Sequence, residues 1–461
     1  MLKFDYNNMM SAMIGAEGFD NKALVGSKDK LSAAATAVVS RRGTGWQEWT
    51  ELPYANQAEI DEIIATGKDI AGKASAWVVF GIGGSALGPL AVATSLLHLK
   101  HNDLSKARRK APKLFVEDNV DPERINALLD VIDLKTTYFN VITKSGETSE
   151  TLAQFLIIYD RLKKKLGEDE AKKRIIVTTT IGKGSLYAAA AKEGFKIYGV
   201  GEGVGGRFSV LCPVGLVTFA VMGLDVHAML DGARKMTEQC IGEDCATNPA
   251  LLTAYLMVEA YRQGKNISVM MPYADSLRYM ADFYCQLWGE SLGKALDLDG
   301  NTVNAGQTPA KSLGVTDQHS QVQLYTEGPF DKVVIFLKVG KFRSKAKITD
   351  GCDNLGDFLK GRTMNELLEA ERVATEFALT KANRLNYTIT FPTVDASTIG
   401  EFLTYLMWQT AYAGYLLNID TFNQPGVEEG KLATFAMLGR KGYEEKLKEI
   451  KSKPKSKKYM M

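Results

Sequence analysis

Short apolar runs that suit buried strands alternate along this chain with longer stretches of helical periodicity, and this alternation limits the folds the chain can form. In the first half, the strand-like runs are 77–80, 114–117, 138–142, 175–180 and 196–200. In the second half, they are 267–271, 333–339 and 387–391. The alternation predicts an α/β protein with largely parallel sheets, because parallel neighbours need a crossover helix between them.

The length of 461 residues favours two α/β domains, since a single hydrophobic core rarely serves a chain of this size. The expected parts are an N-terminal helical arm (1–55), a first domain (56–225), a helical connection (226–265), a second domain (266–439) and a basic C-terminal tail (440–461). The tail holds nine Lys and Arg residues against three acidic ones, which is typical of a solvated, partly helical terminus.

Charge and cysteine usage narrow the class of protein. The 56 Lys and Arg residues nearly balance 54 Asp and Glu residues, so no global field attracts nucleic acid or a membrane surface. An apolar stretch at 402–417 is too short to span a membrane and predicts a buried helix. The five cysteines have no metal-ligand spacing, and no signal peptide is recognisable, so we expect a cytoplasmic protein without structural metal.

A glycine-rich loop directly follows the first predicted strand, where residues 81–89 read Gly-Ile-Gly-Gly-Ser-Ala-Leu-Gly-Pro. Glycines such as Gly84 would let backbone N–H groups approach an anion beside Ser85, at the start of a helix. The same residues also fit a loose dinucleotide fingerprint. That fingerprint requires an acidic residue about 20 residues further on, and the next strand ends at Glu117, well past that distance.

A hydroxyl-rich loop follows the third predicted strand, where residues 143–151 read Thr-Lys-Ser-Gly-Glu-Thr-Ser-Glu-Thr. Hydroxyl and N–H groups at a helix start suit a phosphate group, and Thr143, Ser145 and Thr148 are the candidates. An ordinary capping box is the alternative, with Ser145 or Thr148 as the cap. Glu147 would repel a bound phosphate unless its side chain points away.

Three further segments carry side chains that could act on a substrate. Two glycines precede Arg207, so its guanidinium could lie close to a ligand and stabilise a developing oxyanion. His319 is the best candidate for proton transfer among four histidines. A Pro-Gly turn at 425–426 precedes Lys431, which could reach into a cleft. A turn with a surface Arg, a structural histidine and a surface lysine are the alternatives.

Glu290 continues the apolar stripe of a predicted helix, close in angle to Leu287. Gln286 lies one turn before it, where an amide could orient the carboxylate or a substrate. Burying a carboxylate is costly without a partner or a function. A structural ion pair with Lys294, four residues on, is therefore the alternative to a catalytic base.

Taken together and in order, these six segments resemble the glucose-6-phosphate isomerase family in its shorter bacterial form, over about residues 77–431. The resemblance implies two sugar-isomerase (SIS) domains, each a largely parallel sheet flanked by helices. It implies reversible isomerisation of glucose 6-phosphate and fructose 6-phosphate, in glycolysis and gluconeogenesis, by ring opening and proton transfer through a cis-enediolate. The expected assembly is a homodimer with shared active sites, and no cofactor or metal is expected.

The resemblance also implies a role for each candidate residue. Glu290 would move the proton, Arg207 would stabilise the enediolate, His319 would help to open the ring, and Lys431 would act near the ring oxygen. The residues implied to bind substrate are Gly84, Ser85, Thr143, Lys144, Ser145, Thr148, Gln286 and Gln424. Glu150 would orient the histidine, which the neighbouring subunit supplies. The chain departs from the family at Thr143, which is generally Ser, and at Glu147, which is usually Thr.

Two other functions are compatible with the same segments. An isomerase that accepts mannose 6-phosphate, alone or as a second substrate, would differ in the pocket near C2. A non-catalytic sugar-phosphate-binding regulator of the same fold would lack the base, whereas Glu290 is present.

Overall fold

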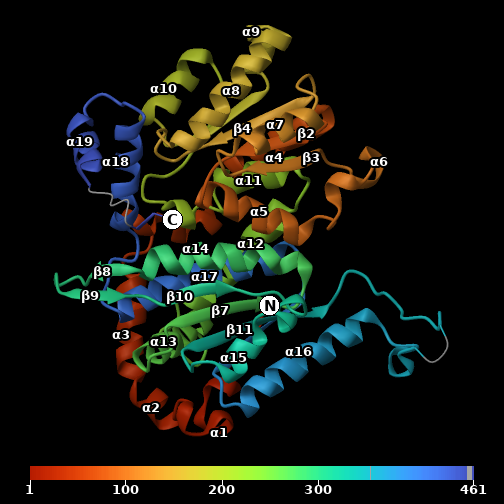
Figure 1. Ribbon diagram of the computed structural model, residues 1–461, viewed down its shortest axis with the longest axis vertical. Coiled ribbons are helices and arrows are strands. Elements are labelled where there is room, and N and C mark those ends of the chain that lie inside the picture. Colours follow the sequence, from red (N-terminus) through yellow and green to blue (C-terminus); the bar gives the residue numbers. More distant parts are fainter. Residues whose placement is uncertain (353–354, 454–458, 461) are drawn as a thin grey trace.

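Two five-stranded sheets organise the computed structural model, which describes residues 1–352, 355–453 and 459–460. The first sheet lies in the upper half of Figure 1 and the second in the lower half, with helices on both. The predicted α/β class is confirmed. The described part of the basic tail contains one helix, Glu444–Ser452, whereas residues 454–458 and 461 of the tail lie outside the described residues.

The first sheet is entirely parallel, in the order β3-β2-β4-β5-β6. Its strands are β2 (Ala76–Phe80), β3 (Lys113–Glu117), β4 (Thr137–Ile142), β5 (Ile175–Thr179) and β6 (Lys196–Gly199). Successive residues of β2 pack into different hydrophobic clusters, Trp77 and Val79 on one face and Val78 and Phe80 on the other. Because both faces are covered, the inner strands read as continuous apolar runs.

The strand order of the first sheet reverses between β2 and β4. The chain passes from β2 to its neighbour β3 and then returns to β4 on the other side of β2. Ligands of open parallel sheets bind outside the carboxyl ends of the strands at such a reversal. The glycine-rich loop follows β2 and the hydroxyl-rich loop follows β4, so both predicted anion loops border this position.

The second sheet has the order β1-β12-β11-β7-β10, and β1 alone is antiparallel to its neighbour. Its strands are β1 (Lys3–Asp5), β7 (Ile267–Pro272), β10 (Thr308–Lys311), β11 (Lys332–Lys341) and β12 (Asn386–Thr393). A separate hairpin is formed by β8 (Lys294–Leu296) and β9 (Thr302–Ala305). Strand β1 joins the start of the expected N-terminal arm to the second sheet; the domain boundaries stay predictions.

Helices connect the strands and cover the sheets. The first half contains α1 (Ser11–Ile14), α2 (Asn21–Gly26), α3 (Lys28–Val39), α4 (Gln57–Lys73), α5 (Gly84–Leu96), α6 (Lys106–Arg109), α7 (Pro122–Val131), α8 (Ser149–Leu166), α9 (Glu168–Lys172), α10 (Gly184–Glu193) and α11 (Pro213–Val221). The remainder contains α12 (Val226–Cys240), α13 (Pro249–Arg262), α14 (Arg278–Leu292), α15 (Val322–Glu327), α16 (Met364–Lys381), α17 (Ala396–Leu416), α18 (Glu428–Met437) and α19 (Glu444–Ser452). Short 3-10 turns include η5 (Gly206–Phe208) and η7 (Thr316–His319).

Helix α17 is the central helix of the core. All but three of its 21 residues are buried, so the predicted buried helix at 402–417 is confirmed. It packs against α12, α13 and α14, and one hydrophobic cluster contains Trp77 of β2, Ile335 of β11 and Trp408 of α17. The two sheets therefore share a core. Across the described ranges, no helix is both long and apolar enough to cross a membrane.

Candidate active site

The two halves of the molecule meet where α5 packs against α14 (Figure 1). Two glycines of the loop before α5 make this approach possible. Gly83 has a φ of 56°, and a Cβ there would lie 2.8 Å from Nε2 of Gln286. A Cβ on Gly84 would lie only 2.1 Å from the carbonyl oxygen of Gly206. The glycine-rich loop thus contacts both α14 and the turn that carries Arg207.

Arg207 lies at the centre of this junction, with 3% of its surface exposed. Its guanidinium donates hydrogen bonds to Oγ of Ser291 (2.6 Å), Oε2 of Glu290 (3.2 Å), Oε1 of Gln424 (3.0 Å) and the carbonyls of Thr421 (2.6 Å) and Asn423 (3.3 Å). Burial lowers the pKa of Arg207, and the Glu290 carboxylate opposes this effect. Because guanidinium groups stay protonated in proteins, the site holds a fixed positive charge.

Glu290 is oriented by two donors, one from each half of the molecule. Its Oε2 accepts from Arg207, and its Oε1 accepts from Nε2 of Gln286 at 3.2 Å. The side chain is 36% exposed, so it lies at the border of the apolar face of α14 rather than within it. The carboxylate is therefore held in place and still open to a ligand.

Lys294 is not the ion-pair partner of the Glu290 carboxylate. Its ammonium donates instead to the backbone carbonyls of Glu290 (2.6 Å) and Ser291 (2.8 Å), at the C-terminal end of α14. Burial, and then the nearby Arg207, lower the pKa of Lys294 to about 8. Lys294 thus satisfies carbonyls that the helix end leaves open, and the alternative of an ion pair between Lys294 and Glu290 is wrong, because the carboxylate pairs with Arg207 instead.

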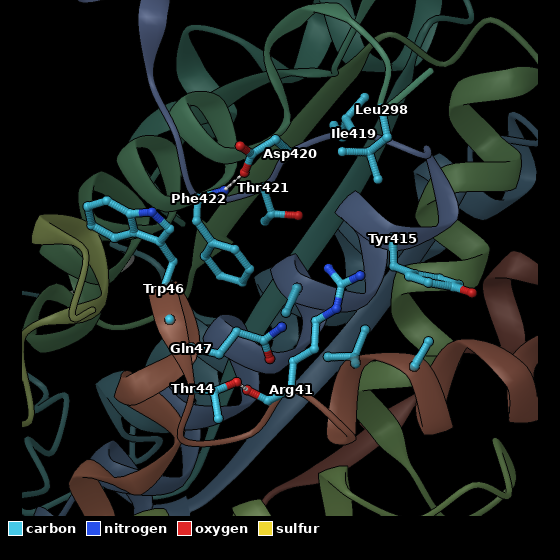
Figure 2. A pocket seen from close by; sticks show the side chains of 14 residues that line it. Arg41, Thr44, Trp46, Gln47, Leu298, Tyr415, Ile419, Asp420, Thr421 and Phe422 are labelled. Atoms are coloured by element: carbon cyan, nitrogen blue, oxygen red, sulfur yellow. Dashed lines mark hydrogen bonds between the residues drawn. The ribbon is translucent and has the colours of Figure 1, made fainter. Parts of the chain in front are cut away.

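The segment that follows α17 completes the surroundings of Arg207. Oδ1 of Asp420 accepts from the backbone amides of Phe422 (3.0 Å) and Asn423 (3.3 Å), which fixes a turn. Figure 2 shows the first of these bonds beside a cavity of about 370 Å³, which Asp420 and Phe422 line together with Trp46. The turn that bounds this cavity therefore also supplies carbonyls to Arg207.

Three hydroxyl groups gather in the loop after β4. Oγ1 of Thr143 lies 2.6 Å from Oγ1 of Thr148 and 3.4 Å from Oγ of Ser145. Thr148 occupies the N-cap position of α8, but its side chain accepts no capping bond. Oγ of Ser145 accepts from the amide of Glu147 at 3.2 Å, before the helix begins, so neither residue forms the capping box that was the alternative. The N-terminus of α8 follows these hydroxyls directly, and this combination suits a phosphate group.

The carboxylate of Glu147 is bonded outside this hydroxyl cluster. Its Oε1 accepts from the amide of Ser185 at 2.8 Å, and its Oε2 accepts from the guanidinium of Arg440 at 3.3 Å. The Ser185 amide, and to a smaller extent Arg440, hold the pKa of Glu147 below its ordinary value. A phosphate in this loop requires the side chain of Glu147 to point away from it. Both carboxylate oxygens bond to groups other than the three hydroxyls, as that requires.

Other predicted binding residues border the two loops. Ser85 lies in the first turn of α5, and Glu150 lies in the first turn of α8. The ammonium of Lys144 donates to the carbonyl of Glu202 at 2.6 Å and lies 4.3 Å above the ring centre of Trp46. Lys144 thus contacts the backbone after β6 rather than the hydroxyl cluster.

His319 and Lys431 lie apart from Arg207 in this chain. His319 is exposed and ends the turn η7. Lys431 forms an ion pair of 2.7 Å with Glu428 on its own helix, α18. Among the residues that the structure describes, no hydrogen bond or ion pair joins either side chain to Arg207 or Glu290. Their predicted catalytic roles stay predictions.

Sequence reasoning missed the groups that surround the guanidinium. Ser291 accepts from Nε of Arg207, and its place next to Glu290 was a usable signal. The carbonyls of Thr421 and Asn423 carry no side-chain signal at all, and they come from more than 200 residues further along the chain.

The fold and this site are those of a phosphosugar isomerase: a parallel sheet with a reversal of strand order carries a hydroxyl cluster before a helix N-terminus, and the junction of the two halves holds an oriented carboxylate beside a fixed cation. A family model described as phosphoglucose isomerase matches residues 54–453. The chain belongs to the phosphoglucose isomerase family, as the resemblance of its motifs predicted.

Individual relatives agree with this assignment over nearly the whole length. A glucose-6-phosphate isomerase of Carboxydothermus hydrogenoformans is 50% identical over 451 residues, which cover 97% of each chain. The crystal structure of a hypothetical protein from Thermus thermophilus has a TM-score of 0.86 and 33% identity, and covers 95% of this chain and 100% of its own. A glucose-6-phosphate isomerase from Chlamydia trachomatis, at 19% identity and a TM-score of 0.78 over 97% of this chain and 96% of its own, supports the fold alone.

Proposed function

We propose that the chain interconverts glucose 6-phosphate and fructose 6-phosphate by ring opening and base-mediated proton transfer through a cis-enediolate. The names of its relatives support this substrate pair. One observation carries the mechanism: Glu290 is held by donors on both of its oxygens, between Arg207 and Gln286, at the junction of the two halves.

The chemistry of the isomerisation requires a base, a cation and a means of opening the ring. Glu290 is the base that removes the proton from C2 of the open-chain aldose and delivers it to C1. The enediolate formed in between carries negative charge on its oxygens, and the fixed charge of Arg207 stabilises it. A carboxylate that is oriented before the substrate arrives loses little freedom in the transition state.

The phosphate group of the substrate is proposed to bind in the hydroxyl-rich loop. Thr143, Ser145 and Thr148 present their hydroxyls there, and the N-terminus of α8 adds its positive end. Gly84, Ser85 and Lys144 are proposed to contribute from the neighbouring loops. Binding at the phosphate, far from C1 and C2, positions the reacting carbons against Glu290.

Ring opening is proposed to use His319 of the partner subunit in a homodimer, oriented by Glu150, with Gln424 and Lys431 near the ring oxygen. The exposure of His319 supports this, because the side chain is available to a second subunit. Two exposed leucines, Leu156 of α8, which also carries Glu150, and Leu324 of α15, which follows η7, support an interface there.

We place the reaction in the cytoplasm, in glycolysis and gluconeogenesis. Buried thiols such as Cys212 and Cys240 are compatible with a reducing compartment.

The test is an assay of fructose 6-phosphate conversion by the purified chain in the presence of EDTA, with glucose 6-phosphate detected by its dehydrogenase. Formation of glucose 6-phosphate supports the proposal, and its absence would overturn it. Mannose 6-phosphate is assayed in parallel, and turnover at a similar rate would show a bifunctional enzyme.

A further inference from the structure

We propose that Arg440 sets the affinity for the sugar phosphate by neutralising Glu147, an inference that rests on the proposed phosphate-binding role of the hydroxyl-rich loop. Glu147 stands between Ser145 and Thr148, two of the three clustered hydroxyl residues. A sugar phosphate carries up to two negative charges, so an uncompensated carboxylate in this loop would oppose its binding.

Arg440 is the side chain that compensates the charge of Glu147. The amide of Ser185 donates to one carboxylate oxygen, but an amide leaves the net charge of the group unchanged. The guanidinium of Arg440 donates to the other oxygen at 3.3 Å and forms the ion pair. Lys144, the cation within the loop itself, contacts the carbonyl of Glu202 instead.

The position of Arg440 is fixed by the helices that carry it. Its guanidinium lies 4.5 Å from the ring centre of Phe435 on α18, and Phe435 packs edge-on against Tyr443 at 5.6 Å. Lys446 of α19 pairs with Glu429 of α18 at 2.8 Å, which joins the two helices to each other. Arg440 is therefore presented to the loop by a folded helical pair.

The same ion pair links this helical pair to the rest of the molecule. Arg440 and Glu147 lie 293 positions apart in the sequence, so their ion pair joins the C-terminal helical pair to the hydroxyl-rich loop. Figure 1 shows α18 and α19 at the side of the molecule, beside α10, whose first turn contains Ser185. The contact therefore brings a positive charge from the C-terminal helices to the carboxylate of the loop.

Four variants test the inference, with the KM for fructose 6-phosphate as the readout. Arg440→Met should raise KM about three- to fivefold, the range expected when one partly exposed charge pair is lost. Arg440→Lys should keep KM near the wild-type value, because it keeps the charge. Lys441→Met is the matched control, since it removes one positive charge from the next, exposed residue and should leave KM unchanged.

The decisive variant combines Arg440→Met with Glu147→Gln. The glutamine still accepts from Ser185 but carries no charge, so KM should return to near the wild-type value. A double variant that keeps the raised KM, or an Arg440→Met variant with normal KM, would overturn the inference. Failure of the wild-type chain to convert fructose 6-phosphate would instead refute the proposed function, and thermal unfolding of each variant identifies any loss of folding.

Discussion

Oε2 of Glu290 accepts a hydrogen bond from the guanidinium of Arg207 at 3.2 Å, across the junction between the two halves of the molecule. Gln286 donates to the other oxygen, so the carboxylate has a fixed direction. Arg207 itself is held by acceptors on two segments, α14 and the stretch 421–424, and this network holds a carboxylate beside a fixed positive charge.

Replacement of Glu290 by Gln tests the base directly. An amide of the same shape cannot take up the proton, so we expect fructose 6-phosphate binding to stay roughly intact and isomerisation to fall by at least about 100-fold. Exchange of the transferred hydrogen with heavy water should stop. Calorimetry measures the binding, and NMR measures the exchange. Glu238→Gln on the exposed face of α12 is the control, and normal turnover by Glu290→Gln would refute the mechanism.

The first sheet could be predicted closely because its three inner strands, β2, β4 and β5, are buried on both faces. The predicted runs for β2 to β6 begin and end within one residue of the observed strands. Strands β1 and β10 were missed, since Lys3–Asp5 and Thr308–Lys311 are short and mix polar with apolar residues. Their pairing depends on neighbours that lie far away in the chain, and local periodicity does not report such partners.

The residues of the site could be predicted from the sequence, but the contacts between distant residues could not. Arg207, Gln286, Glu290 and Gln424 were all named from their motifs, and the structure joins them. The partner of Glu147 was not foreseen, because Arg440 lies 293 positions further along the chain. Motifs report which chemistry a segment can perform, whereas tertiary packing alone decides which distant side chain compensates a charge.

Replacement of Arg207 by Lys tests the shape of the cation as well as its charge. A lysine keeps one positive charge but cannot reproduce bonds to five acceptors, so several buried carbonyl and hydroxyl groups would lose their donor. We expect kcat/KM to fall by at least about 100-fold. We also expect the free energy of unfolding to fall by about 3 kcal/mol. Steady-state kinetics and urea unfolding measure the two effects.

Arg384 provides the matched control for that experiment. It donates to the carbonyls of Thr326 (2.9 Å) and Gly328 (3.0 Å), in the second half of the chain and outside the site. Arg384→Lys should lower stability and leave kcat/KM nearly unchanged. An active Arg207→Lys variant would show that a positive charge alone suffices at this position.

A mixing experiment tests whether the active site is shared between subunits. Glu290→Gln and His319→Asn homodimers should each be nearly inactive. In a mixed dimer, one site combines both substitutions and the other combines an intact Glu290 with an intact His319. Random exchange of equal amounts should therefore restore about a quarter of the wild-type activity, because half of the dimers are mixed. Sites contained within single chains would restore none, and size-exclusion chromatography confirms that exchange has occurred.

The stability of the protein should depend on pH through Lys294, because this residue is 7% exposed and burial lowers its pKa to about 8. Below pH 8, the folded and unfolded states both carry the proton. Between about pH 8 and 10.5, the folded state has lost the proton that the unfolded state still holds, so stability contributed by this group rises with pH. The unfolding free energy of the wild type, measured relative to that of Lys294→Met, should therefore rise by about 2 kcal/mol from pH 8 to 10. Urea unfolding at one protein concentration measures this difference, and a value that stays constant would contradict a buried, shifted Lys294.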